Sequence, residues 1–132
     1  MTQPDEATAP LVSELPFGPH TADALCTLAH SLGLVAVRID LEGCVDENDL
    51  FGRIAGALEF PDWFGHNWDA LFDCLNDLSW LEARGLLLVF ENTGDLADAA
   101  PQAWQMLRDM LIETAAEWRE QDVPFRAMLS AS

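Results

Sequence analysis

The chain has 132 residues, of which 50% are hydrophobic, and it carries 6 Lys plus Arg against 23 Asp plus Glu, for a formal net charge of −17 at pH 7. This acidity argues against binding to nucleic acid or to an anionic membrane, because both need a basic protein surface. Length and hydrophobic content together indicate one folded domain with its own core and exclude a globally disordered chain. The acidity suits a basic partner or serves solubility alone.

The cysteines and the hydrophobic runs bear on the cellular compartment. The cysteines are odd in number and lack paired metal-ligand spacing, which is typical of reduced thiols: Cys26, Cys44 and Cys74. The N-terminus has no basic region followed by an apolar run, so it does not resemble a signal peptide. The longest apolar runs, such as GLLLVF, are too short to cross a bilayer. We therefore expect a cytoplasmic protein.

The N-terminal third predicts a lead-in, a helix and a strand. Residues 1–19 contain four of the seven prolines, so we expect an irregular lead-in there and the folded domain at residues 20–132. The stretch HTADALCTLAHSLG predicts a helix that ends at Gly33, with Thr21 as its N-cap. The β-branched stretch LVAVRIDL (34–41) predicts a strand. The expected core face of the helix consists of Leu25, Leu28, Ala29 and Leu32.

After the turn at EGC, helices and strands alternate. The stretch DENDLFGRIAGALEF predicts a helix, GLLLVFEN (85–92) a strand covered on both faces, and FRAMLS (125–130) a last strand. A long helix is expected from Pro101 to about Glu120. The alternation predicts an α/β fold with a small parallel sheet covered by helices. The expected inward residues of the two helices are Leu50, Ile54, Ala57 and Leu58, then Trp104, Leu107, Leu111, Ala115 and Trp118.

The stretch FPDWFGHNWDALFDCLNDL (60–78) predicts a loop followed by a helix with two different faces. Asn67 is a good N-cap, and Gly65 allows a sharp turn before it. At about 100° per residue, one side of the helix is apolar and suits the core: Leu71, Cys74, Leu75 and Leu78. The nearly opposite side carries Asp69, Asp73 and Asn76, with Trp68 and Phe72 on the flank between the two sides.

The paired aspartates and the aromatic residues beside them suggest a binding surface. Asp69 lies in the first turn, where the helix dipole favours a negative charge. Asp73 lies one turn later and repels Asp69 by about 0.2–0.5 kcal/mol, which an ordinary solvated face would tolerate. Aromatic residues beside charges are typical of an interface anchor. From the residues alone, Trp63, Phe64 and Trp68 suit an interface and aromatic core packing about equally well.

The stretch LEFPDWFGHNWDALFDCL resembles the signature of the barstar family of ribonuclease inhibitors. The resemblance rests on the order, spacing and type of Pro61, an acidic residue at 62, an aromatic pair at 63 and 64, Gly65, Asn67, Asp69, Ala70, Leu71, Asp73, Cys74 and Leu75. The stretches VRIDLEG, LLLVFEN and FRAMLS resemble strands of the family, so roughly residues 35–130 are covered. The resemblance implies a three-stranded parallel sheet flanked by helices, to which the helix around residues 20–33 is an addition.

The resemblance also implies a function and a set of contact residues. Family members bind the active site of a basic, secreted microbial ribonuclease inside the producing cell and keep it harmless until export. By position, Asp73 matches the family's most important aspartate, Asp69 its companion, and the aromatic pair with Gly65 the loop that lies on the nuclease. A late glutamate usually joins the contact, and it matches Glu117, with Glu113 and Glu120 as alternatives. The expected partner-binding residues are Trp63, Phe64, Gly65, Asn67, Trp68, Asp69, Asp73, Asn76 and Glu117.

Other chemistry finds little support in the sequence. His66 lies near the aspartates, but no second His or Cys stands at ligand spacing. The acidic stretch DLEGCVDENDLFG lacks the spacing of a calcium loop, and neither a phosphate-binding glycine loop nor a nucleophile–base motif occurs. We therefore expect no metal, no cofactor and no catalysis. The alternative to a nuclease inhibitor is an acidic interaction module that regulates a basic cytoplasmic partner that is not a nuclease.

Overall fold

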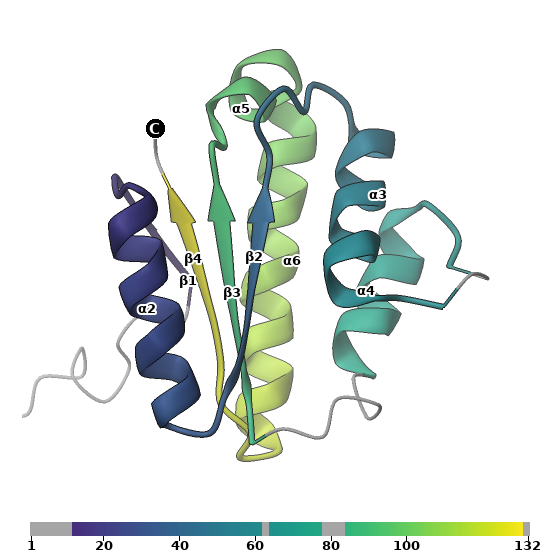
Figure 1. Ribbon diagram of the computed structural model, residues 1–132. Helices are drawn as coiled ribbons and strands as arrows, with labels where there is room; N and C mark the ends of the chain where they lie inside the picture. The colour runs from purple at the N-terminus through teal and green to yellow at the C-terminus, as the bar shows by residue number, and fades with distance from the viewer. Residues whose placement is uncertain (1–11, 62–63, 78–83, 131–132) are drawn as a thin grey trace, which may run out of the picture.

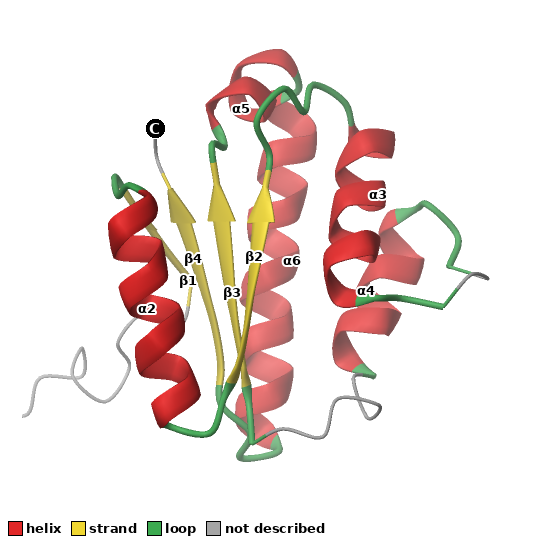
Figure 2. Cartoon of the chain, in the orientation of Figure 1, coloured by secondary structure: helices red, strands yellow, loops and turns green. Residues whose placement is uncertain are grey.

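The computed structural model describes residues 12–61, 64–77 and 84–130 and shows an α/β fold around one parallel sheet (Figure 1, Figure 2). The strands are β1 (Val12–Leu15), β2 (Val35–Asp40), β3 (Leu86–Glu91) and β4 (Phe125–Ser130), in the spatial order β1-β4-β3-β2. All neighbouring strands in this order run parallel. The predicted α/β class and the parallel sheet are confirmed.

The sheet has four strands, so the prediction of three was wrong. The additional strand, β1, lies within residues 1–19, where an irregular lead-in was expected. It pairs with β4 in a register that joins Val12 to Ala127 and Leu15 to Ser130. Four residues close to prolines give little local strand signal, and the partner strand is distant in sequence. Pairing with β4 therefore decides the conformation of this segment, which local pattern alone could not reveal.

The helices of the described residues are α2 (Pro19–Ser31), α3 (Glu47–Leu58), α4 (Trp68–Asn76), α5 (Gly94–Ala99) and α6 (Pro101–Glu120). Figure 1 shows α2 in front of the sheet and α6 behind it. The larger core joins α3, α4 and α6 to the sheet through buried side chains that include Leu50, Ile54, Leu71, Leu75, Leu88, Phe90, Leu107 and Leu111. The smaller core lies under α2 and consists of Ala22, Ala29, Leu87 and Val89.

Helix α2 differs from its prediction at its start and on its inner face. Gly18 occupies the N-cap position and Pro19 begins the helix, so Thr21 is not the cap. The side chains of Leu28 and Leu32 are 57% and 58% exposed, whereas both were expected in the core. The helix instead places its small residues Ala22 and Ala29 against the sheet. Close contact of a helix with a sheet through alanines leaves longer side chains on the flank of the helix in solvent.

Ion pairs attach α2 to the sheet. The guanidinium of Arg38 on β2 donates from Nε and Nη2 to the carboxylate of Glu91 on β3, at 2.8 and 2.7 Å. The same guanidinium pairs with Asp23 on α2. Three elements therefore meet at one cation, in the bidentate geometry that suits arginine best.

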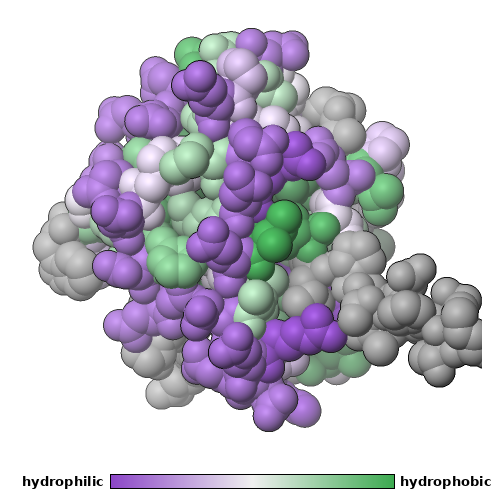
Figure 3. Space-filling view, turned by 180° about the vertical axis from the view of Figure 1, so that it is seen from behind, coloured by the Kyte–Doolittle hydropathy of each residue, from purple (hydrophilic) through white to green (hydrophobic). Residues whose placement is uncertain are grey.

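The back of the molecule combines hydrophilic and hydrophobic areas. Figure 3 shows hydrophilic residues over much of this face, with hydrophobic areas between them near its middle. In the part of the chain that the structure describes, no helix is both long and apolar enough to span a membrane.

A truncation in the larger core should separate buried from exposed leucines. Leu75 is 1% exposed and belongs to the core between α4 and the sheet. We expect Leu75→Ala to lower the free energy of unfolding by about 2–5 kcal/mol, because it leaves a cavity. Leu28→Ala, the same substitution at an exposed site, should change it by about 0.5 kcal/mol or less. Urea unfolding followed by circular dichroism measures both, and equal losses would contradict the assignment of the two sites.

The pKa of Asp40 offers a test of the edge where the strands end. Its carboxylate accepts hydrogen bonds from Nδ2 of Asn92 at 2.8 Å and from the backbone N–H of Glu42 at 3.0 Å. These bonds lower the pKa of Asp40 below its ordinary value, the bond from Asn92 most strongly. A lowered pKa in the folded state stabilises the fold above the unfolded-state pKa, and this stabilisation is lost as the pH falls through the folded-state pKa.

We therefore expect Asn92→Gly to raise the pKa of Asp40 and to reduce the acid-dependent loss of stability. Glycine suits this substitution because Asn92 has a positive φ of 57°. Side-chain carboxyl NMR titration measures the pKa, with the other carboxyl groups in the same spectra as controls. An unchanged Asp40 titration would contradict the role of the amide.

Candidate functional site

Helix α4 presents the candidate site, and its start is fixed by a side-chain cap. Oδ1 of Asn67 accepts a hydrogen bond from the backbone N–H of Ala70 at 2.8 Å, as predicted for an N-cap. Leu71, Cys74 and Leu75 are buried against the core, which confirms the predicted inner face for these three residues. Leu78, expected on the same face, lies outside the described residues. Burial also raises the pKa of the Cys74 thiol, and the charges of Asp73 and Asp77 add to this.

The outer face of α4 carries the two aspartates. Asp69 and Asp73 are both exposed and stand one turn apart. Among the described residues, neither carboxylate takes part in an ion pair or a side-chain hydrogen bond. Since the opposite face of the helix is held in the core, the two carboxylates have a fixed direction into solvent. This arrangement is suited to receiving cationic groups of another molecule.

Phe64, in the loop before the helix, packs against neighbouring rings. Phe64 is 8% exposed, and its ring lies 5.1 Å from that of Phe60 and 5.4 Å from that of His66, centroid to centroid. The structure therefore packs Phe64 largely into the core, and its contact with a partner stays a prediction. Gly65 is exposed. Trp63, the other aromatic residue of the predicted loop contact, lies outside the described residues.

Trp68 is half-buried and connects α4 to α3. Its ring packs edge-on against Phe51 with a centroid distance of 4.9 Å, and its Nε1 donates a hydrogen bond to Oε2 of Glu47 at 3.1 Å. Next to it, Nδ1 of His66 lies 3.3 Å from Oδ1 of Asn48. Glu47 and Asn48 belong to the first turn of α3, so the starts of two helices meet here.

The sequence interpretation had not included Glu47 and Asn48 in the site. The only local signal is the acidic start of the predicted helix in DENDLF. Their position beside α4 depends on the packing of Trp68 against Phe51. As a result, the carboxylate of Glu47 adds to the negative charge at the start of α4.

Of the remaining predicted contact residues, Asn76 turns its side chain toward its own helix and Glu117 is exposed. Nδ2 of Asn76 donates to the carbonyl oxygen of Phe72 at 2.9 Å, and its Oδ1 is shielded from solvent, so this amide is turned toward its own helix. Glu117 is exposed on α6, and the neighbouring Trp118 donates from Nε1 to the carbonyl oxygen of Leu75 at 3.1 Å. This bond joins the C-terminal part of α6, on which Glu117 lies, to α4. Glu113 and Glu120 are exposed as well, so exposure does not separate the three glutamates.

The site offers carboxylates on a rigid frame and little other chemistry. Within the described ranges, no three His, Cys, Asp or Glu side chains come together as ligands for a metal ion. His66 contacts two aromatic rings and an amide oxygen. The helix holds the carboxylates of Asp69 and Asp73 at defined positions, and no described residue forms an ion pair with either of them.

A comparison with models of protein families matches residues 34–130 to the family described as Barstar (barnase inhibitor). The matched part is most of the chain and contains α3, α4, α5, α6 and the strands β2, β3 and β4. A search of curated proteins found no match.

The cap at Asn67 generates a prediction about the frame of the site. We expect Asn67→Ala to lower the free energy of unfolding by about 1 kcal/mol, because the N–H of Ala70 loses its acceptor. The control Asn48→Ala removes an exposed amide in the first turn of α3 that caps no helix and should have a smaller effect. Urea unfolding of both variants measures the difference, and equal effects would show that the cap does not fix the start of α4.

Proposed function

The chain belongs to the barstar family, and we propose that it inhibits a basic microbial ribonuclease by placing Asp69 and Asp73 in the active site of that enzyme. The family match supports a ribonuclease inhibitor at the level of the family. The observation that supports this mode of binding is the pair of exposed carboxylates on one face of a helix whose other face is buried. The proposal places the inhibitor inside the cell that makes the nuclease.

Charge complementarity explains how such a helix would block the enzyme. The active site of a ribonuclease binds phosphates, so it needs cationic side chains at the phosphate positions. Carboxylates can take these positions through charge-assisted hydrogen bonds, which are shorter and stronger than those between neutral groups. Because α4 is anchored through Leu71 and Leu75, its carboxylates lose little freedom on binding, and this preorganisation favours affinity.

The net charge of −17 would attract a basic enzyme before the two proteins touch. A strongly acidic inhibitor and a basic enzyme attract each other over a distance set by the ionic strength, and this raises the association rate. Barnase and barstar are the standard example of such steering and of a dominant aspartate at an interface. Steering and the role of Asp73 are therefore proposed for this chain by analogy with its family.

The proposed interface combines the acidic helix with its surroundings. Asp69 and Asp73 would contact cations, and Gly65, Trp63 and the exposed edge of Trp68 would lie on the surface of the enzyme around the cleft. Glu117 would add a carboxylate from α6. Phe64, Asn67 and Asn76 would support the site from within, in keeping with the burial of Phe64 and the hydrogen bonds of the two amides.

Inhibition of RNA cleavage tests the proposal directly. We expect the purified chain to abolish cleavage at a near-equal molar ratio, first with barnase and then with the basic ribonucleases of the source organism. Undiminished cleavage by all of these enzymes at a molar excess of the chain would refute the proposal. Capture of a basic protein that is not a nuclease, with no inhibition, would favour the alternative of an acidic regulatory module.

The effect of Asp73 on affinity gives a sharper test. We expect Asp73→Ala to weaken binding to an inhibited ribonuclease by about 2 kcal/mol or more, which is about 30-fold, because a desolvated cation in the enzyme loses its partner. Asp98→Ala makes the same change in net charge at an exposed position of α5 and should leave affinity nearly unchanged. Isothermal titration calorimetry measures both affinities, and circular dichroism verifies that both variants are folded.

A further inference from the structure

The sheet face beneath α2 is covered over part of its width. Helix α2 packs on β2 and β3, through Ala22 and Ala29 against Leu87 and Val89. Parallel sheets are normally covered by helices on both faces. On the α2 face, β4 and β1 contribute Arg126, Met128 and Ser13 to an open groove beside the helix.

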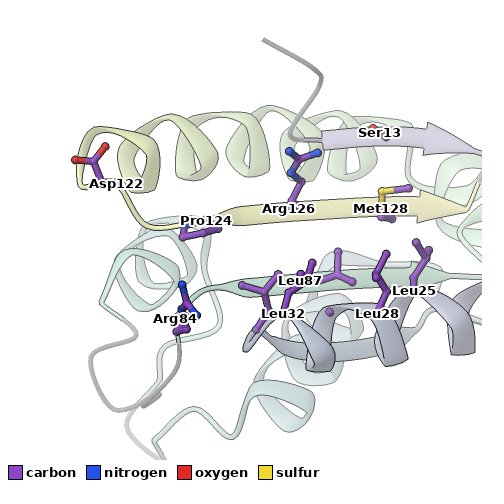
Figure 4. Close-up of a pocket in the computed structure, with 12 residues that line it drawn as sticks. Ser13, Leu25, Leu28, Leu32, Arg84, Leu87, Asp122, Pro124, Arg126 and Met128 are labelled. Carbon is purple, nitrogen blue, oxygen red and sulfur yellow. The ribbon is translucent and has the colours of Figure 1, made fainter. Parts of the chain in front are cut away.

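The groove is large and mostly apolar. Its volume is about 960 Å³, at the upper end of the range typical of sites for small molecules. Its apolar wall is formed by Leu25 and Leu28 from α2, Leu32 at the C-cap of that helix, Leu87 from β3 and Met128 from β4 (Figure 4). Leu28 and the C-cap residue Leu32 are more than half exposed, although the helix itself packs on the sheet. Apolar area of this kind, left open to water, indicates a binding surface.

Two arginines give the groove its charge. The chain has 6 Lys plus Arg, and three of the arginines form ion pairs with described residues: Arg38, Arg53 and Arg108. Arg84 and Arg126 both line the groove, and neither forms an ion pair with any residue that the structure describes. Asp122 also lines the groove, and Figure 4 shows it at the end of the groove, on the turn between α6 and β4.

Arginines without partners are unexpected in so acidic a protein. With 23 Asp and Glu in the chain, most cations can find a carboxylate at little cost. Two that do not both line this apolar groove, and each guanidinium presents a planar set of donors that suits a carboxylate. A cationic amphiphile would meet two like charges there. An anionic membrane is disfavoured by the net charge of −17, so the complementary occupant is a free molecule.

We propose that the groove between α2 and β4 binds a free long-chain aliphatic carboxylate. The aliphatic chain lies along Leu28, Leu32 and Met128, and the carboxylate accepts hydrogen bonds from a guanidinium at the border of the groove, that of Arg84 or that of Arg126. This site is on the α2 face, whereas α4 belongs to the core on the other face of the sheet (Figure 1). It therefore holds independently of whether the chain inhibits a ribonuclease.

Titration calorimetry with dodecanoate tests this site on the full chain, with dodecyltrimethylammonium as the matched cationic probe. We expect dodecanoate to bind at a ratio of one to one and the cation at least tenfold more weakly. The double variant Arg84→Gln with Arg126→Gln should weaken dodecanoate binding at least tenfold. Arg53→Gln, which removes the same charge from α3 and lines no part of the groove, should leave it unchanged. Circular dichroism verifies the fold of each variant.

Three results would overturn the proposal. The first is no binding of dodecanoate, and the second is equal affinity for the anionic and cationic probes. The third concerns a second copy of the chain as the occupant. If sedimentation shows a dimer that Leu28→Ser with Leu32→Ser dissociates, the groove is an interface between copies and not a site for a carboxylate.

Discussion

The burial of β3 on both faces is the constraint on which the rest of the structure depends. Residues 86–90 of this strand are all buried, with Leu88 and Phe90 in the core toward α3, α4 and α6, and Leu87 and Val89 in the core toward α2. Five consecutive apolar residues in one strand are stable only if both faces of that strand are kept from water. The larger core does this on one side and fixes α4, while the smaller core does it on the other side for two of the four strands.

The position of α4 follows from the larger core, and the direction of its aspartates follows from the position of α4. Leu71 and Leu75 hold one face of the helix inward, and Trp118 bonds to the carbonyl oxygen of Leu75. The aromatic residues near the start of the helix then act as a frame, since Phe64 is buried and Trp68 joins α3. Stability and the acidic surface are therefore carried by different side chains of the same nine-residue helix.

The sequence predicted those features that a single element determines. The cap at Asn67, the buried face of α4 and the strand at residues 85–92 follow from spacing and residue type, and the structure agrees. The errors concern features that depend on distant partners. Strand β1 forms because β4 is beside it, and the exposure of Leu28 and Leu32 depends on which strands α2 covers. The sequence also left open whether the aromatic residues near the start of α4 pack in the core or lie at an interface. Phe64 packs against Phe60 and Trp68 against Phe51, and these contacts are visible only in the folded structure.

The ion pairs of the described arginines lie away from the two aspartates of α4. In the described part of the chain, Arg38, Arg53 and Arg108 pair with carboxylates that fix α2, the start of α3 and β1. None of these ion pairs reaches Asp69 or Asp73, whose repulsion one turn apart remains uncompensated in the free protein. A cation supplied by another molecule would remove this repulsion in addition to forming its own bonds. The free protein is thus less stable than it would be with a paired helix, and a basic partner at this helix would recover the difference on binding.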